Sequence, residues 1–183
     1  MQKQTNSKIL WMTRTAIFIA LIIVSQAVTA PLGNTLVTGS IVNLILIVAV
    51  MTCGPACGLS AAAVSPVMAK LLGIGPLWAL IPFIMAGNIV LTLVWHFIGN
   101  KSFKNKHNNR YAAYITALVA AAVSKFAVLY FGVVRVAVPL LNLPEKQAAV
   151  ISATFSVSQL ITASVGGALA VILLPQLKKA IKP

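Results

Sequence analysis

The chain has 183 residues, of which 60% are hydrophobic and only 8% are charged. An average globular domain carries about 25% charged residues, so these few charges could not cover the surface of a water-soluble fold. The net charge is +13, and Glu145 is the only acidic side chain. Most basic residues stand in short gaps between apolar runs rather than on one water-exposed face. The composition therefore predicts an integral membrane protein. It excludes a soluble domain and a nucleic-acid-binding protein.

Six apolar stretches are candidates for membrane-spanning helices, each judged against the roughly 20 residues that cross a hydrocarbon core. The second and third stretches are separated only by Gly54-Pro55, and Ser65-Pro66 interrupts the third. No linker or soluble segment stands between them. The sequence therefore predicts an all-α fold, a bundle of six transmembrane helices in a single transmembrane domain over residues 1–183. The predicted spans are 11–30, 40–51, 54–72, 77–98, 111–134 and 148–174.

The distribution of lysine and arginine predicts how the bundle is oriented. Both tails and the gap after the fourth span are rich in these residues, which mark the cytoplasmic side of membrane proteins. The other gaps carry fewer charges. We therefore expect a multi-pass protein of the plasma membrane with both termini in the cytoplasm. Trp11 and Trp95 are then expected at the inner interface and Trp78 at the outer one. The residues on the cytoplasmic side are Lys3, Lys8, Arg14, Lys101, Lys104, Lys106, Arg110, Lys178, Lys179 and Lys182.

Catalytic chemistry is hard to build from this sequence. His96 and His107 lie at or beyond the inner end of the fourth span, with no carboxylate near them. Cys53 and Cys57 are spaced CxxxC and have no neighbouring histidine. General acid–base catalysis and metal binding both need further partners. We therefore expect no catalytic residue, no metal site and no cofactor.

Polar residues inside the spans are the candidates for solute binding, because their burial in lipid is costly. Lys125 lies well inside the fifth span, and Arg135 follows ten residues later on broadly the same helical side. The other candidates lie in the second, fourth and sixth spans and at the outer end of the third. They could instead only join helices by hydrogen bonds, or Lys125 could extend to an interface. The full set of substrate-binding candidates is Asn43, Lys70, Asn88, Lys125, Arg135, Ser156 and Gln159.

The charge of these candidates favours an anionic solute. The spans contain no Asp or Glu to neutralise a bound organic cation, whereas Lys125, Arg135 and Lys70 would make an outer cavity electropositive. A carboxylate on the solute would form a charge-assisted hydrogen bond with the buried lysine. Pantothenate and nicotinate fit this description. A neutral flavin- or pyrimidine-type vitamin stays open as an alternative if Lys125 reaches an interface.

Several features together resemble one family of transport proteins. A basic residue, Arg14, precedes an AxxxA motif formed by Ala16 and Ala20 in the first span, and Gly73-Ile74-Gly75-Pro76 forms a turn after the third span. With six helices in under 200 residues, the chain resembles the S component, the substrate-binding subunit, of an energy-coupling factor (ECF) vitamin transporter. The resemblance covers nearly the whole chain. A stand-alone membrane channel or scaffold protein is the alternative, and a membrane-embedded enzyme is disfavoured.

The resemblance implies a function without catalysis. Such a subunit captures a vitamin or a precursor outside a bacterial cell, in a pocket roofed by the first external loop and lined by the outer halves of later helices. It does not hydrolyse ATP. A membrane coupling protein and two ATPase subunits are its implied partners. In that family the alanines of the first helix pack on the coupling protein, which makes Ala16 and Ala20 the expected partner interface.

Overall fold

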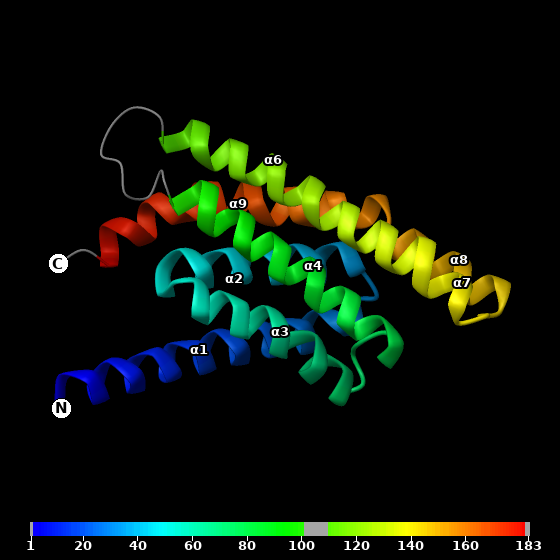
Figure 1. Cartoon of the computed structure of the whole chain (residues 1–183), viewed down its shortest axis with the longest axis horizontal. Helices are drawn as coiled ribbons and strands as arrows, with labels where there is room; N and C mark the ends of the chain where they lie inside the picture. The colour runs from blue at the N-terminus through cyan, green and yellow to red at the C-terminus, as the bar shows by residue number, and fades with distance from the viewer. Residues whose placement is uncertain (1, 101–109, 182–183) are drawn as a thin grey trace.

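The computed structural model describes residues 2–100 and 110–181, and the regular structure within them is helical throughout. His107 and four of the residues predicted on the cytoplasmic side lie outside these ranges. The four are Lys101, Lys104, Lys106 and Lys182. Figure 1 shows the long helices running along one common direction. The elements are α1 (Gln2–Thr29), η1 (Ala30–Leu32), α2 (Thr35–Cys53), α3 (Pro55–Leu71), η2 (Trp78–Leu80), α4 (Ile81–Val94), η3 (Trp95–Gly99), α6 (Arg110–Leu129), η4 (Tyr130–Ala137), α7 (Val138–Leu140), α8 (Glu145–Thr154) and α9 (Val157–Ile181).

The predicted all-α membrane bundle is confirmed. Within the described residues, five helical segments are long and apolar enough to cross a membrane: Lys8–Leu32, Thr35–Cys53, Trp78–Gly99, Tyr111–Leu140 and Glu145–Lys179. The remaining predicted span corresponds to α3, which has 17 residues and contains Pro66 in its interior. At 1.5 Å per residue, α3 is roughly 25 Å long, somewhat less than the hydrocarbon core. It packs against α1, α2 and α4.

Local sequence signals set the ends of α2. The helix begins at Thr35, five residues before the predicted span, because Asn34 caps it: the Asn34 Oδ1 atom accepts hydrogen bonds from Leu36 N at 3.0 Å and Val37 N at 3.4 Å. A search for apolar residues alone does not detect such a cap, because the capping residue is polar. At the other end, Gly54 adopts a φ of 92°, which glycine tolerates, and Pro55 opens α3. The predicted break at Gly54-Pro55 is confirmed.

The central helix of the bundle is α2, which packs against α1, α3, α4 and α9. Its contact with α9 is close because glycine faces the neighbouring helix. A Cβ atom added at Gly166 would lie 2.6 Å from the Ser40 carbonyl oxygen and 2.8 Å from Asn43 Cβ. A Cβ atom at Gly39 would lie 2.9 Å from Thr162 Cγ2. Small residues thus let the two backbones approach and bring their short polar side chains within reach of each other.

Two apolar clusters form the core. The larger includes Leu46, Leu91 and Trp95, and the smaller includes Leu129 and Phe155. Trp11 and Trp78 are exposed, as expected for interfacial tryptophans. The expectation for Trp95 was wrong: its side chain is fully buried in the larger cluster, with its ring centroid 6.2 Å from that of Tyr114. A tryptophan near the end of an apolar run suits a core as well as an interface, because most of its surface is apolar.

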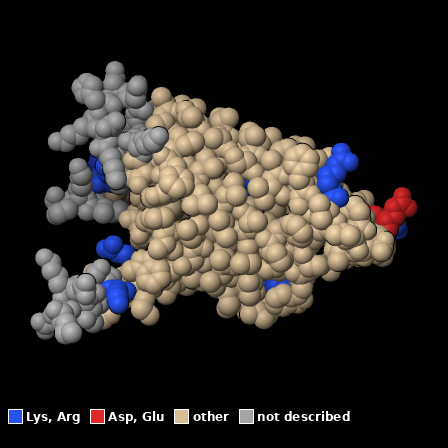
Figure 2. All heavy atoms as spheres, in the orientation of Figure 1, with Lys and Arg blue, Asp and Glu red and all other residues tan. Residues whose placement is uncertain are grey.

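The described charges lie mainly toward the two ends of the bundle. Figure 2 shows basic side chains at both ends, the acidic side chain at one end, and an almost uncharged belt between them. Figure 1 places the start of α1 and the end of α9 at one end, and the turn between α7 and α8 at the other. This distribution suits a molecule whose long axis crosses a bilayer, with its charges in the aqueous and headgroup layers.

Candidate functional site

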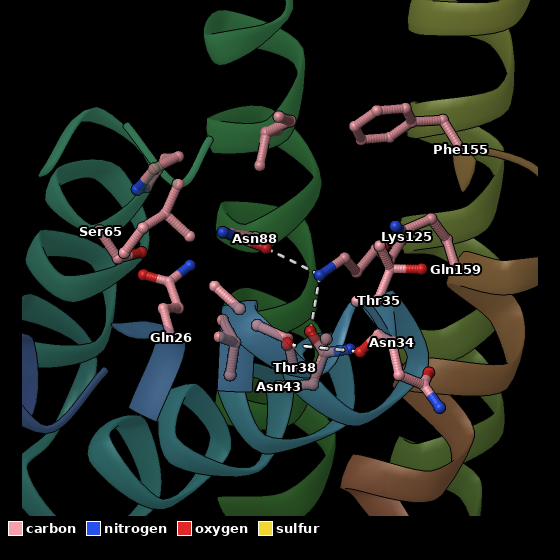
Figure 3. Close-up of a pocket in the computed structure, with 17 residues that line it drawn as sticks. Gln26, Asn34, Thr35, Thr38, Asn43, Ser65, Asn88, Lys125, Phe155 and Gln159 are labelled. Atoms are coloured by element: carbon pink, nitrogen blue, oxygen red, sulfur yellow. Dashed lines mark hydrogen bonds between the residues drawn. The ribbon is translucent and has the colours of Figure 1, made fainter. Parts of the chain in front are cut away.

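A cavity of about 280 Å³ lies in the half of the bundle away from the chain termini. This volume is near the lower end of the roughly 300–1,000 Å³ that small-molecule sites occupy. Its walls come from both apolar clusters, since Val42 belongs to the larger and Phe155 to the smaller. Figure 3 shows the lining side chains. They are Gln26, Ala30, Gly33, Asn34, Thr35, Thr38, Gly39, Val42, Asn43, Ser65, Pro66, Ile74, Ile84, Asn88, Lys125, Phe155 and Gln159.

Lys125 on α6 is the charged group of the cavity wall. Its side chain is only 4% exposed. The Nζ atom donates to Asn43 Oδ1 at 2.6 Å and to Asn88 Oδ1 at 2.7 Å, so three helices meet at this ammonium group. Figure 3 shows both hydrogen bonds. An ammonium group has three N–H donors, and the described residues accept from two of them. One donor is therefore left for a group in the cavity.

Close helix packing places these three residues together. A Cβ atom added at Gly87 would lie 2.9 Å from Leu129 Cγ, so α4 and α6 are in tight contact next to Asn88 and Lys125. Gly166 of α9 has the same role beside Asn43 on α2. Gly87 lets α4 and α6 approach closely enough for the short Asn88 side chain to reach Lys125, whereas Gly166 brings α9 against α2 at Asn43. The contact requires no long polar side chain from α2 or α4.

The asparagine amides are oriented by their neighbours. Lysine can only donate, so both asparagines present their oxygen atoms to it. The Asn43 Nδ2 atom then donates to Thr162 Oγ1 at 3.4 Å, and Thr162 Oγ1 donates to the Gln159 carbonyl oxygen at 3.1 Å. Figure 3 shows the Asn88 amide nitrogen on the side of its amide that faces away from Lys125. The site therefore offers positive charge and N–H donors, an arrangement that suits an anion.

The loop between α1 and α2 covers part of the cavity and is tied down at several points. Gly33 adopts a left-handed conformation with a φ of 64°, and its N–H donates to the Ala30 carbonyl at 3.0 Å. Thr38 Oγ1 on α2 donates to Thr29 Oγ1 on α1 at 2.8 Å. Together with the Asn34 cap, these bonds hold the loop residues on the cavity wall.

The structure brings together four of the seven predicted substrate-binding residues, Asn43, Asn88, Lys125 and Gln159. The other three lie off the cavity wall. Lys70 is half-buried near the end of α3, and Ser156 Oγ donates to the Ala153 carbonyl at 3.2 Å in the break between α8 and α9. Arg135 is exposed, with its guanidinium carbon 5.6 Å from the centroid of the Tyr130 ring.

A change of helical period explains the position of Arg135. The prediction that Arg135 shares a helical side with Lys125 assumed an α-helical rotation of about 100° per residue along the whole fifth span. Residues Tyr130–Ala137 instead form the π-helical segment η4. A π-helical turn contains an additional residue and rotates every later side chain away from its α-helical position. Arg135 therefore does not share the face of Lys125.

The sequence predictions missed several polar residues of the cavity wall. Gln26 on α1, Thr38 on α2 and Ser65 on α3 all line it. Their spans have a modest polar content, and nothing in the apolar pattern separates a cavity-facing side chain from one that bonds to its own helix. The available signals were Asn34, a typical cap residue before α2, and the Ser65-Pro66 pair within an apolar run.

The predicted partner-interface residues lie on a different surface. Ala16 and Ala20 are both exposed on α1. Their neighbours Met12, Ile17 and Val24 are also exposed, with 61%, 59% and 59% of their surfaces accessible. This side of α1 thus presents an apolar surface, and two small residues one helical turn apart would let another helix approach its backbone closely.

A comparison with known protein families decides between a transporter subunit and a stand-alone channel or scaffold protein. The sequence pattern of the family described as "ECF transporter, substrate-specific component" matches residues 11–179. The chain belongs to this family. It is therefore a membrane S component for vitamin-type uptake, and its family is one of substrate-binding transporter subunits rather than of enzymes. The curated proteins and the solved structures gave no match to this S component.

Proposed function

We propose that this S component captures a carboxylate-bearing vitamin or vitamin precursor, such as pantothenate or nicotinate, in the Lys125 cavity. The supporting observation is the buried ammonium group of Lys125, held by two neutral amides. Amide oxygens solvate the ammonium group but do not cancel its charge. A solute carboxylate at the remaining N–H would neutralise the charge and form a charge-assisted hydrogen bond.

The same cavity disfavours an organic cation. A cation would need a carboxylate or an aromatic cage to replace its water shell. Among the described residues that line the cavity, Phe155 is the aromatic one and none is acidic. A neutral ring vitamin would leave the Lys125 charge without a counter-ion. An anion is thus the solute that the described wall accommodates best.

A panel of vitamins tests the substrate class. We expect calorimetric titration of the purified protein in detergent to show binding of pantothenate or nicotinate, and none of thiamine. Riboflavin represents the neutral ring vitamins. Tight binding of riboflavin or thiamine, with neither carboxylate bound, would overturn the proposal.

The proposal extends to partners and orientation. The protein would deliver its solute to a membrane coupling protein that is driven by two ATPase subunits, with Ala16 and Ala20 at the contact. Both termini would lie in the cytoplasm. The start of α1 and the end of α9 lie at the same end of the bundle, and these segments carry Lys8, Arg14 and Lys179. The cavity would then lie in the outer half of the membrane.

Single cysteines test this orientation. In a variant with Cys53→Ala and Cys57→Ala, we expect Glu145→Cys to react with a membrane-impermeant maleimide on intact cells. We expect Lys179→Cys to react only after the cells are permeabilised. The parent variant without cysteine is the control for background labelling. The opposite pattern would contradict the orientation and place the cavity on the cytoplasmic side.

A further inference from the structure

Two buried polar atoms of the cavity wall have no hydrogen-bond partner among the described residues. They are Ser65 Oγ on α3 and Gln26 Oε1 on α1. Ser65 is only 1% exposed. Most buried polar atoms in folded proteins are hydrogen-bonded, so each exception calls for an explanation. Both exceptions here line the same cavity.

Other buried or partly buried hydroxyl groups show what Ser65 lacks. Thr15, Ser40 and Thr52 each donate to the carbonyl oxygen four residues earlier, at 2.8, 2.7 and 2.7 Å. This is the usual way in which a helix satisfies a hydroxyl group away from water. The Ser65 hydroxyl makes no such bond to its own helix. It is therefore available to a molecule in the cavity.

The two atoms lie across the cavity from the charged group. Helices α1 and α3 pack against each other and contribute Gln26 and Ser65 to one wall. Figure 3 shows these two side chains on one side of the view and Lys125 on the other, with Asn88 between them. The Asn88 amide nitrogen points toward the Gln26 and Ser65 wall. A solute that touches Lys125 and spans the cavity would therefore reach both unpartnered atoms.

We propose that Gln26 and Ser65 form a second recognition site, which binds an uncharged hydroxyl or amide group of the solute. This inference rests on the proposed function, because it assumes that a carboxylate occupies the Lys125 end. A serine hydroxyl and a glutamine amide each donate and accept, which matches the hydrogen-bonding capacity of a hydroxyl or an amide. Neither carries the charge that a second ionised group would need. The substrate class is thus a carboxylate with a hydroxyl or amide at its other end.

This site would discriminate between the two candidate vitamins. Pantothenate has an amide and hydroxyl groups beyond its carboxylate, whereas nicotinate has only a ring nitrogen that accepts a hydrogen bond. A site whose polar groups stay unpartnered with the wrong solute selects strongly against that solute. We therefore expect the wild-type protein to bind pantothenate more tightly than nicotinate.

The test is calorimetric binding of pantothenate and nicotinate to Ser65→Ala, Gln26→Leu and Lys125→Met. We expect Ser65→Ala and Gln26→Leu each to weaken pantothenate binding about threefold to tenfold, the usual effect of losing one hydrogen bond. Nicotinate binding should stay nearly unchanged in both. Lys125→Met should weaken the binding of every carboxylate that the wild type binds. Ser40→Ala is the matched control, since Ser40 is buried, bonds within its own helix and does not line the cavity.

Thermal unfolding separates recognition from a structural role. Ser65→Ala removes a buried hydroxyl without a partner, so we expect its Tm to stay unchanged or to rise. Ser40→Ala removes a satisfied hydroxyl and should lower the Tm. A Ser65→Ala variant that loses stability and binds both vitamins less well would show a structural role and overturn the inference.

The remaining outcomes distinguish this inference from the proposed function. Pantothenate binding that is weakened by Lys125→Met but unchanged in Ser65→Ala and Gln26→Leu would overturn the second recognition site alone. A wild-type protein that binds nicotinate but not pantothenate would also overturn only that site. Pantothenate binding that is unchanged in Lys125→Met, or a wild-type protein that binds neither vitamin, would overturn the proposed function as well.

Discussion

Replacing Lys125 by methionine is expected to weaken the binding of a carboxylate-bearing vitamin by at least about 30-fold. Methionine has a similar length and no charge, so the solute carboxylate would be buried without a counter-ion. Removing one partner of a buried, hydrogen-bonded charge pair costs about 2–5 kcal/mol, and each 1.4 kcal/mol is about tenfold in affinity. Calorimetry of pantothenate and nicotinate on the two proteins measures the change.

The bundle should still fold in this variant, because the contacts of Gly87 with Leu129 and of Gly166 with Asn43 do not involve the lysine. Lys70→Met is the matched control: it removes a half-buried lysine that does not line the cavity, and should leave affinity nearly unchanged. Equal weakening in both variants would indicate a general effect of positive charge. A large fall in Tm for Lys125→Met, with unchanged affinity, would instead assign the lysine a structural role.

A tryptophan at Ala16 or Ala20 is expected to reduce vitamin uptake by cells to the background level while vitamin binding stays intact. Both alanines are exposed on α1, and neither lines the cavity. An indole ring on this surface would hold a partner helix away from the α1 backbone, on which close helix packing depends. Uptake of labelled vitamin in cells that carry the coupling protein and its ATPases measures the loss, and calorimetry measures binding.

Ala168→Trp is the control for a bulky ring on the apolar outer surface. Ala168 is also exposed, but on α9. Uptake should stay near the wild-type level in this variant. If Ala16→Trp and Ala20→Trp preserve both binding and uptake, the partner surface lies elsewhere. If all three tryptophans abolish uptake, the effect comes from membrane insertion or expression, and the assignment of α1 fails.

The architecture could be predicted because membrane spans depend on a simple physical requirement. A helix of about 20 apolar residues is long enough to cross the bilayer, and it pairs its own backbone N–H and C=O groups. Long apolar runs and Gly54-Pro55 therefore located the helices without an explicit packing argument. The start of α2 was placed too late because the cap residue Asn34 begins the helix in a stretch, 35–39, where polar and small residues interrupt the apolar pattern.

Part of the candidate site could also be predicted. Lys125, Asn43 and Asn88 stand out because polar residues in lipid are costly. Their meeting point could not be predicted, because it depends on glycine contacts between helices that are distant in sequence. Arg135 shows the opposite failure: a helical wheel places it beside Lys125, but the π-helical segment η4 rotates it away. The sequence carries the Ser65-Pro66 signal, but only the folded structure reveals that Ser65 Oγ and Gln26 Oε1 are buried without a partner among the described residues.

The central claim is that Lys125 binds the carboxylate of a vitamin-type solute. Its most direct test compares pantothenate with panthenol, the alcohol in which an uncharged hydroxymethyl group replaces the carboxylate. Both compounds offer the same amide and hydroxyl groups to the Gln26 and Ser65 wall, so only the charge differs. Calorimetry on the wild-type protein is expected to show pantothenate binding at least about 30-fold more tightly than panthenol. Equal affinity for the two compounds, or tighter binding of panthenol, would contradict the account.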